Sequence, residues 1–408
     1  MDRTILHSDC NSFYASVECF YHPELKNVPM AVCGDPGNRH GIILAKNEPA
    51  KRYRIQTAEP IWQALQKCPE LVLRPAHHER YREFSDRINR VYLDYTNQVE
   101  PFSIDESWLD VSGSLHLFGS GKEIADLLRR RIREEIGVTI SVGVSFNKTF
   151  AKMGSDYKKP DATTMISREN FRDILYPLPV SAMLSVGANT AAALEKMRIH
   201  TIGNLAEASR EYLVRQLGKL GGVLYDHANG LDDSPVRDFG DVEEPKSIGN
   251  SITFKRDLVS AEDINLGITT LADSVAARLR KHGMKCWTVQ ITIKNPSLKS
   301  ITRQTTLPSP SFLMTDLRDT AMRLIRENWR IGAPVRLLGL TASTLVLENQ
   351  AGEQLSLFRP GIEKEERRER LEKAVDEIRQ RMGGNAISFA SVVNNDIGID
   401  DLKKQEER

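Results

Sequence analysis

Short apolar runs alternate with amphipathic stretches along the first 170 residues. The run at 5–9 ends at Asp9 and indicates a buried strand. Residues 79–95 have apolar or aromatic side chains at helical spacing, which predicts an amphipathic helix. The same patterns predict strands at 29–33, 41–45, 99–111 and 138–144 and helices at 11–20, 46–54 and 120–136. Interleaved strands and helices indicate an α/β fold for this half.

Two local signals define where elements meet or begin. The turn-forming residues 34–38 stand between two of the predicted strands, so we expect them to close a hairpin. Ser120 and Glu123 have the spacing of a capping box, so we expect a helix to begin there.

The second half has a different texture. Residues 169–232 are predicted to form helical pieces separated by glycines, and a polar linker follows. The stretch 287–293 alternates apolar and polar residues, as a half-buried strand does. A highly charged helix is expected at about 361–382, solvated on its surface, with a partner site as the alternative. Residues 400–408 are expected to be disordered.

Composition narrows the class of protein. Of the 408 residues, 40% are hydrophobic, yet no run approaches the roughly 20 apolar residues of a membrane span. The N-terminus is too polar for a secretory signal, so a cytoplasmic protein is expected. Five cysteines without CxxC spacing favour reduced thiols over disulfides or a zinc site.

Charge is unevenly distributed although the net charge is only +1. Residues 246–347 contain 15 Lys and Arg against 7 Asp and Glu, a net charge of +8, and residues 348–408 have a net charge of −3. A basic module suggests a domain that binds a polyanion, and a solvated charged surface is the alternative.

Three acidic residues stand where carboxylates are unexpected. Asp9 ends one apolar strand, and Asp105 and Glu106 are adjacent in the centre of the segment 99–111. A buried carboxylate needs compensation, and a hard cation supplies it. Three carboxylates from two strands could hold two Mg²⁺ ions about 3.5–4 Å apart. The alternative is that Asp105 begins a tight turn and Glu106 points to solvent.

Four motifs in order resemble the Y-family DNA polymerases, most of all their polymerase IV-like branch. They are HSDCNSFYASVE at 7–18, SIDES at 103–107, SVGVSFNKTFAK at 141–152 and KKP at 158–160. The resemblance runs from Arg3 to about Phe358. It implies template-directed, low-fidelity translesion synthesis without proofreading, on primer-template DNA and deoxynucleoside triphosphates.

The resemblance also implies a right-hand architecture: an α+β palm, small fingers, a helical thumb and an α/β little finger. The expected boundaries are a palm at 1–10 and 77–168, fingers at 11–76, a thumb at 169–235, a linker at 236–245, a little finger at 246–348 and a tail at 349–408.

The resemblance assigns the metal ligands, for two Mg²⁺ ions, to Asp9, Asp105, Glu106 and the backbone carbonyl of Cys10. It places Phe13, Tyr14, Lys51 and Lys159 at the nucleotide. Tyr14 would be the steric gate under the deoxyribose, and Phe13 fits a core aromatic as well. Lys159 would contact the triphosphate. Lys148 and Lys152, one helical turn apart, could face phosphate or solvent, with solvent or a structural ion pair favoured for Lys148.

The segment 45–51 departs from the polymerase IV pattern. Glu48 and Lys51 stand where Tyr and Arg are usual, and Ala45 stands where a hydroxyl residue is frequent. Lysine replaces a bidentate fork with a point charge, and Glu48 would repel a triphosphate unless it turns away or pairs with Lys51 or Arg52. Weaker nucleotide binding is therefore expected, and the polymerase V branch stays open.

Two further segments resemble contact sites of this family. Val186, Gly187 and Ala188 resemble a helix-hairpin-helix that holds a DNA phosphate, with a plain helix–turn–helix connection as the alternative. Residues 354–358, QLSLF, resemble the peptide that docks into the bacterial sliding clamp, with contacts from Gln354, Leu355, Leu357 and Phe358. A monomer is expected.

Two other classes of protein compete with the polymerase. One is a DNA-binding or clamp-recruited factor that has lost its catalytic activity; the presence of all three acidic residues argues against it. The other is a different two-metal enzyme with a palm-like fold, such as a nucleotide cyclase; the basic module and the clamp-like peptide argue against it. No P-loop GxxxxGK[ST] is present, which disfavours an ATP-driven motor.

Overall fold

The computed structural model describes residues 2–35, 41–241, 243–350, 362–384, 386–392 and 395–399. The chain divides between Val242 and Glu243 into an N-terminal and a C-terminal compact unit. This division falls inside the linker predicted at 236–245. The finer division into palm, fingers and thumb stays a prediction.

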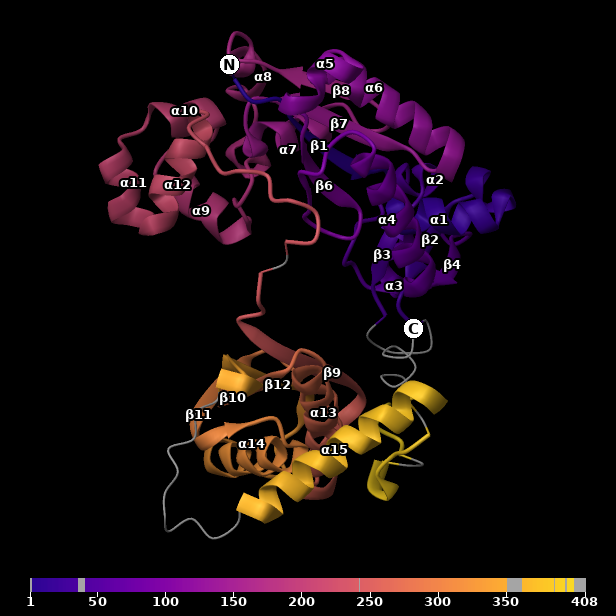
Figure 1. Cartoon of the computed structure of the whole chain (residues 1–408), viewed down its shortest axis with the longest axis vertical. Helices are drawn as coiled ribbons and strands as arrows, with labels where there is room; N and C mark the ends of the chain where they lie inside the picture. Colours follow the sequence, from indigo (N-terminus) through magenta and orange to yellow (C-terminus); the bar gives the residue numbers. More distant parts are fainter. Residues whose placement is uncertain are drawn as a thin grey trace. The chain divides into compact units, whose positions relative to one another are not determined.

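A five-stranded sheet organises the N-terminal unit (Figure 1). Its strands, in spatial order, are β5 (Val99–Pro101), β6 (Glu106–Asp110), β1 (Ile5–Cys10), β7 (Ile140–Ser145) and β8 (Thr163–Ile166). Strands β7 and β8 run parallel, and the other neighbours are antiparallel. The strands predicted at 5–9, 99–111 and 138–144 are therefore confirmed.

Strand β1 is buried on both faces because helices cover each side. On one face, Ser8 Oγ and the hydroxyl of Tyr92 lie 2.6 Å apart, and Tyr92 belongs to α4 (His78–Leu93). On the other face, His7 Nδ1 lies 2.9 Å from Ser155 Oγ, on α7 (Lys148–Tyr157). Side chains alternate along a strand, so Asp9 shares the α7 face with His7.

Gly143 lets α7 lie close against the sheet. A Cβ atom at this position would stand 1.9 Å from the carbonyl oxygen of Ala151 and 2.5 Å from the backbone nitrogen of Ser155. Both atoms belong to the backbone of α7, so no side-chain rotation relieves the clash. The absence of a side chain on β7 thus sets the depth of the helix whose residues face Asp9.

Helix α6 (Gly121–Arg131) covers the same face as α4 and begins with the predicted capping box. The hydroxyl of Ser120 accepts the backbone N–H of Glu123, and the Glu123 carboxylate accepts the backbone N–H of Ser120. These bonds satisfy two N–H groups that a helix start leaves open.

A second, three-stranded sheet has the order β3 (Ile43–Lys46), β2 (Met30–Cys33), β4 (Val72–Pro75). Strands β2 and β3 are antiparallel, which confirms their predicted pairing, although residues 36–38 of the turn predicted at 34–38 lie outside the described residues. The neighbouring helices are α1 (Phe13–Tyr21), α2 (Glu48–Lys51) and α3 (Ile61–Lys67).

Helix α2 is shorter than the helix predicted at 46–54. Its start is fixed by Asn47, whose side chain accepts the N–H of Ala50. Three residues after its end, Arg54 has a φ of 57°, a left-handed conformation that cannot continue an α-helix. The prediction of a nine-residue helix was wrong because local capping limits it to one turn.

Short helices form the last part of the N-terminal unit, as the glycine-separated pieces predicted. They are α8 (Phe171–Leu175), α9 (Ala188–Lys196), α10 (Ile202–Glu207), α11 (Arg210–Leu217) and α12 (Lys219–Ala228). Their apolar core continues onto α7 through Phe150 and Met153, so this helical part packs against the unit's main sheet layer.

The C-terminal unit is a four-stranded antiparallel sheet with helices packed on one face. Its strands, in spatial order, are β11 (Ser300–Ser311), β10 (Met284–Lys294), β12 (Val335–Leu347) and β9 (Ser247–Leu258). Helices α13 (Ala261–Lys281) and α14 (Met314–Asn328) supply the apolar side of the core. The strand predicted at 287–293 lies within β10.

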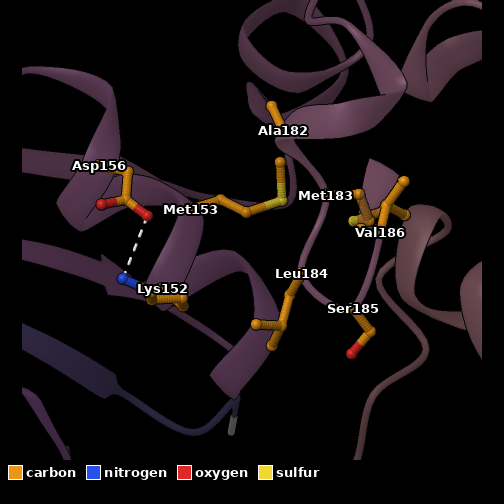
Figure 2. Close-up of a pocket in the computed structure, with 9 residues that line it drawn as sticks. Lys152, Met153, Asp156, Ala182, Met183, Leu184, Ser185 and Val186 are labelled. Atoms are coloured by element: carbon orange, nitrogen blue, oxygen red, sulfur yellow. Dashed lines mark ion pairs between the residues drawn. The ribbon is translucent and has the colours of Figure 1, made fainter. Parts of the chain in front are cut away.

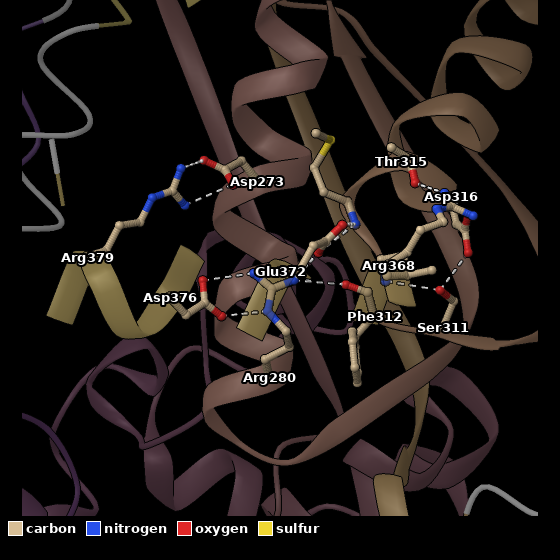
Figure 3. Close-up of polar contacts among 12 residues, drawn as sticks. Asp273, Arg280, Ser311, Phe312, Thr315, Asp316, Arg368, Glu372, Asp376 and Arg379 are labelled. Carbon is tan, nitrogen blue, oxygen red and sulfur yellow. Dashed lines mark hydrogen bonds and ion pairs between the residues drawn. The ribbon is translucent and has the colours of Figure 1, made fainter. Parts of the chain in front are cut away.

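Helix α15 (Ile362–Met382) docks on this unit by ion pairs, which corrects the expectation of a wholly solvated helix. Arg280, with a side chain only 5% exposed, pairs with Glu372 and Asp376, and Arg379 pairs with Asp273 at 2.9 Å (Figure 3). Beyond it, Ile397 and Ile399 enter the apolar core. The segment predicted to be disordered, 400–408, lies outside the described residues.

We predict that Gly143→Ala lowers the free energy of unfolding by more than about 3 kcal/mol, because its Cβ clashes with the α7 backbone. Chemical denaturation measures the loss. Gly113→Ala is the matched control, since a Cβ there meets nothing within 4 Å. Equal stability of the two variants would contradict the close packing of α7.

Candidate active site

The strand register brings the three predicted carboxylates to one end of the sheet. Asp9 on β1 is the pairing partner of Glu106 on β6. The backbone N–H of Cys10 donates to the carbonyl oxygen of Asp105 at 3.0 Å. Asp9 itself is only 4% exposed. Residues nearly one hundred positions apart thus present their side chains at the same place.

Two lysines pair with these carboxylates. Lys152 Nζ lies 3.1 Å from Asp9 Oδ2 and 2.8 Å from Glu106 Oε1. Lys159 Nζ lies 2.6 Å from the same Asp9 oxygen. Both ammonium groups also pair with Asp156, at 3.1 and 2.8 Å. Lys152 therefore faces neither solvent nor a free phosphate site, because α7 directs it at the carboxylates.

Asp105 has a different hydrogen-bond partner from Asp9 and Glu106. Its Oδ1 accepts the hydroxyl of Ser103 at 2.7 Å. Among the described residues, no three acidic, histidine or cysteine side chains converge closely enough to hold a metal ion as they stand. Asp9 and Glu106 share Lys152 as a partner while Asp105 accepts from Ser103, so coordination of one ion by all three requires side-chain rotation.

Burial and mutual repulsion perturb the site's ionisation. Burial, with a hydrogen bond to Asp9, raises the pKa of Glu106 to about 7. Burial also raises the pKa of Asp105. For Asp9, burial acts upward, but the hydrogen bond with Glu106 and the charges of Lys159 and Lys152 outweigh it, and the net shift of the pKa is downward. Burial and the closeness of the three carboxylates thus make it unfavourable for all of them to be ionised at the same time.

This donor set fits hard divalent cations. Carboxylate oxygens at a buried strand end are the ligands that Mg²⁺ prefers. A raised pKa is the expected response of a carboxylate that is buried beside another carboxylate, as Glu106 is beside Asp9. Glu106 is 18% exposed and bound to Lys152, so the alternative of a solvent-facing Glu106 does not hold.

Tyr14 lies on α1, half-buried and stacked on another tyrosine. Its ring and that of Tyr81 have centroids 4.0 Å apart and planes 13° apart. Phe13, by contrast, is 3% exposed within the apolar core. Phe13 is thus a core aromatic residue, whereas the ring of Tyr14 packs on Tyr81 and stays partly exposed.

Glu48 pairs with Lys51 in α2, one of the two arrangements that would remove its repulsion toward a triphosphate. The pair is three residues apart, and both side chains are about half exposed. Cys10 is 3% exposed, and burial raises the pKa of its thiol far above the usual value, so the thiol is an inert buried group.

A pocket of about 380 Å³ separates α7 from the segment before α9 (Figure 2). Lys152 and Asp156 lie on one side, Ser185 and Val186 lie on the other, and Gly187 also lines the pocket. Gly187 is the N-cap of α9, and no side chain caps the helix, so the first N–H groups, from Ala188 onward, stay available.

Residues 354–358, the predicted clamp-binding peptide, lie outside the described residues.

Known proteins similar to the chain decide its family. The impB/mucB/samB family matches residues 8–156, and the C-terminal domain of that family matches residues 245–357. The DNA polymerase IV of Acetivibrio thermocellus is 48% identical over 384 residues, which are 94% of this chain and 96% of the relative. The chain belongs to the bacterial DNA polymerase IV branch of the Y-family polymerases.

Further relatives agree with this membership. DNA polymerase IV 1 of Bacillus subtilis is 37% identical over 406 residues, 100% of this chain and 95% of the relative. A solved Y-family polymerase chimera shares the fold with a TM-score of 0.74, at 22% identity, over 84% of this chain and 99% of its own. The polymerase V branch, which the sequence left open, is therefore not favoured.

Sequence reasoning missed two supporting residues of this polymerase. Asp156 bridges the two lysines, and its position four residues after Lys152 on the predicted helix was a signal for the first of these pairs. His7 lies under Glu106, with its Nε2 buried, 3.9 Å from Glu106 Oε2 and without a hydrogen-bond partner. Burial, then the charge of Lys152, lowers its pKa, so the imidazole is neutral.

Lys148 has the structural role that the sequence favoured. Its ammonium lies 2.7 Å from Glu100 and 4.4 Å from the ring centre of Trp108. Arg237 also pairs with Glu100, at 3.1 Å.

In the described part of the chain, no helix is long and apolar enough to span a membrane.

We predict that Lys148→Met lowers the free energy of unfolding by about 2 kcal/mol, because Glu100 keeps only Arg237 as a counter-ion. Thermal or chemical unfolding measures it. The variant Lys122→Met, which removes an exposed pair with Asp126, should cost less than about 0.5 kcal/mol. Equal costs would remove the structural role of Lys148.

Proposed function

We propose that this chain carries out template-directed DNA synthesis past damaged or stalled sites, with Asp9, Asp105 and Glu106 as its metal ligands. Family membership supports the reaction, and one observation supports the ligands. Carboxylates from β1 and from the β5–β6 turn meet at a buried strand end, where burial and the hydrogen bond with Asp9 raise the pKa of Glu106. The backbone carbonyl of Cys10 is proposed as an additional ligand.

Two Mg²⁺ ions are the proposed cofactors; when bound, they would activate the primer 3′-hydroxyl and neutralise the leaving pyrophosphate. The chain's own residues bind and orient the reactants. The pairing of β1 with β6 holds the backbones of Asp9 and Glu106 in register, so their side chains start from fixed positions. Burial of Asp9 keeps bulk water from screening the charges that meet there.

The nucleotide site is proposed to include Phe13, Tyr14, Lys51 and Lys159. Helix α1 has no side-chain cap, so its first N–H groups stay available for phosphate oxygens. Lys159, 32% exposed beside Asp9, would turn toward the triphosphate. Lys51 would do so only by leaving Glu48, which supports weak nucleotide binding.

DNA is proposed to bind through phosphate contacts. The pocket between α7 and Val186–Gly187 adjoins Lys152, which supports a primer strand held there by N–H groups of Gly187 and Ala188; the N–H of Val186 donates to the carbonyl oxygen of Met183. The basic residues of 246–347 would hold the duplex further along. The sliding clamp is proposed to dock on residues 354–358. We propose a monomer that works in the cytoplasm, where bacterial DNA and nucleotides are.

Primer extension with Mg²⁺ tests the proposal. Glu106→Ala is expected to reduce kcat by at least about a thousandfold while the protein stays folded, since only the site's carboxylate is lost. Glu135→Ala, on an exposed carboxylate paired with Arg131, is the matched control and should retain wild-type synthesis. Near-normal synthesis by Glu106→Ala would remove its role as a ligand.

Sugar selection tests Tyr14. We predict that Tyr14→Ala raises ribonucleotide incorporation by about tenfold or more, because an open space replaces the ring that excludes a 2′-hydroxyl. Single-nucleotide extension with matched deoxy- and ribonucleoside triphosphates measures the ratio. Tyr21→Ala, on an exposed tyrosine of the same helix, should leave the ratio unchanged. An unchanged ratio in Tyr14→Ala would refute the gate.

Clamp stimulation tests residues 354–358. Deleting them is expected to abolish stimulation by the clamp and to spare synthesis without it, because only a docking anchor is lost. Extension lengths with and without loaded clamp measure the effect. The pair Leu357→Ala and Phe358→Ala, which keeps the segment's length, should behave alike. Full stimulation of either variant would place the docking site elsewhere.

A further inference from the structure

Lys152 stands at the centre of the carboxylate cluster. Its ammonium lies 3.1 Å from Asp9 Oδ2, 2.8 Å from Glu106 Oε1 and 3.1 Å from Asp156 Oδ2. Three carboxylates match the three N–H donors of an ammonium group. The side chain is only 13% exposed. Lys152 is thus a buried cation enclosed by acidic groups.

The lysine is held there by charge. Burial alone would lower the pKa of Lys152, but the charges of Asp9, Asp156 and Glu106 raise it above the usual value. The ammonium and the carboxylates therefore stabilise one another.

The oxygens that Lys152 binds are those that a divalent cation would need. Asp9 Oδ2 and Glu106 Oε1 are occupied by ammonium protons, and Asp9 Oδ2 is shared with Lys159. A carboxylate oxygen that closely coordinates Mg²⁺ is less able to accept an ammonium hydrogen bond at the same time. The positive charge of Lys152 also repels an approaching cation.

We propose that Lys152 is a built-in counter-ion of the active site, which releases Asp9 and Glu106 when the first divalent cation binds and thereby sets the cation concentration that the site requires. This inference rests on the proposed metal role of the carboxylates. Lys152 is a positioning residue here, because it acts through Asp9 and Glu106.

Asp156 gives the displaced ammonium a place to go. It lies four residues after Lys152 on α7, and its side chain is 51% exposed (Figure 2). The pocket of about 380 Å³ that both residues line provides the space. Lys152 keeps one ion pair as it leaves the other two, which makes the exchange reversible.

Lys148 provides the matched control. It lies one turn earlier on the same helix, is also nearly buried, and pairs with Glu100 rather than with the carboxylate cluster. Removing its charge disturbs α7 to a similar degree without freeing an oxygen of Asp9 or Glu106.

Binding of Mn²⁺ to the full chain without DNA tests the proposal. The electron paramagnetic resonance signal of free Mn²⁺ is followed during titration of the wild type, Lys152→Met and Lys148→Met. Half-saturation is expected at a concentration at least about fivefold lower in Lys152→Met, and within about twofold of wild type in Lys148→Met. In EDTA, Lys152→Met should melt at a lower temperature, with a larger rise on adding Mn²⁺ than the wild type shows.

Equal or weaker Mn²⁺ binding by Lys152→Met would overturn the counter-ion role. Should that variant not fold, Lys152→Gln keeps a hydrogen-bond donor without the charge and decides in the same way. Asp9→Asn separates the two hypotheses. If it binds Mn²⁺ as the wild type does, the proposed metal site itself is wrong, and the inference with it. If only Asp9→Asn weakens binding and neither Lys152 variant tightens it, the metal site stands and the counter-ion role is lost.

Discussion

The attraction between a buried carboxylate cluster and nearby lysines is the constraint on which the site depends. Asp9 ends a strand buried on both faces, where an unpaired charge would be very costly. Lys152 and Lys159 compensate it, and Asp156 holds both lysines in place. The same negative charge that needs the lysines suits divalent cations, so folding and the proposed chemistry draw on one electrostatic feature.

The scaffold places this feature with backbone contacts rather than with flexible side chains. Pairing of β1 with β6 sets Asp9 opposite Glu106. The missing side chain of Gly143 lets α7 approach until Lys152 reaches both carboxylates. Small shifts of α7 would lengthen these ion pairs. The geometry of the site therefore depends on the close packing of α7 against the sheet.

Local patterns predicted most of the fold, and long-range pairing explains what they did not. Apolar runs located β1 and β10, and the Ser120 capping box located the start of α6, because these signals are local. The partners of Lys152 come from strands 46 and 143 residues away, which spacing along one helix cannot reveal. For the same reason, the many charged residues of α15 led to the prediction of a solvated helix. In the structure, acidic residues of α15 pair with Arg280 on α13, a partner that is distant in the sequence. The family motifs located Asp9, Asp105 and Glu106, but not the cations that hold them.

The most direct test of the central claim is a crystal structure of the chain with primer-template DNA, an incoming nucleotide that cannot react, and Mn²⁺, with anomalous scattering recorded. The account predicts two anomalous peaks about 3.5–4 Å apart, held by carboxylate oxygens of Asp9, Asp105 and Glu106, with Lys152 turned to Asp156. Peaks away from these carboxylates, or Lys152 still bound to Asp9 and Glu106 beside a bound ion, would contradict it.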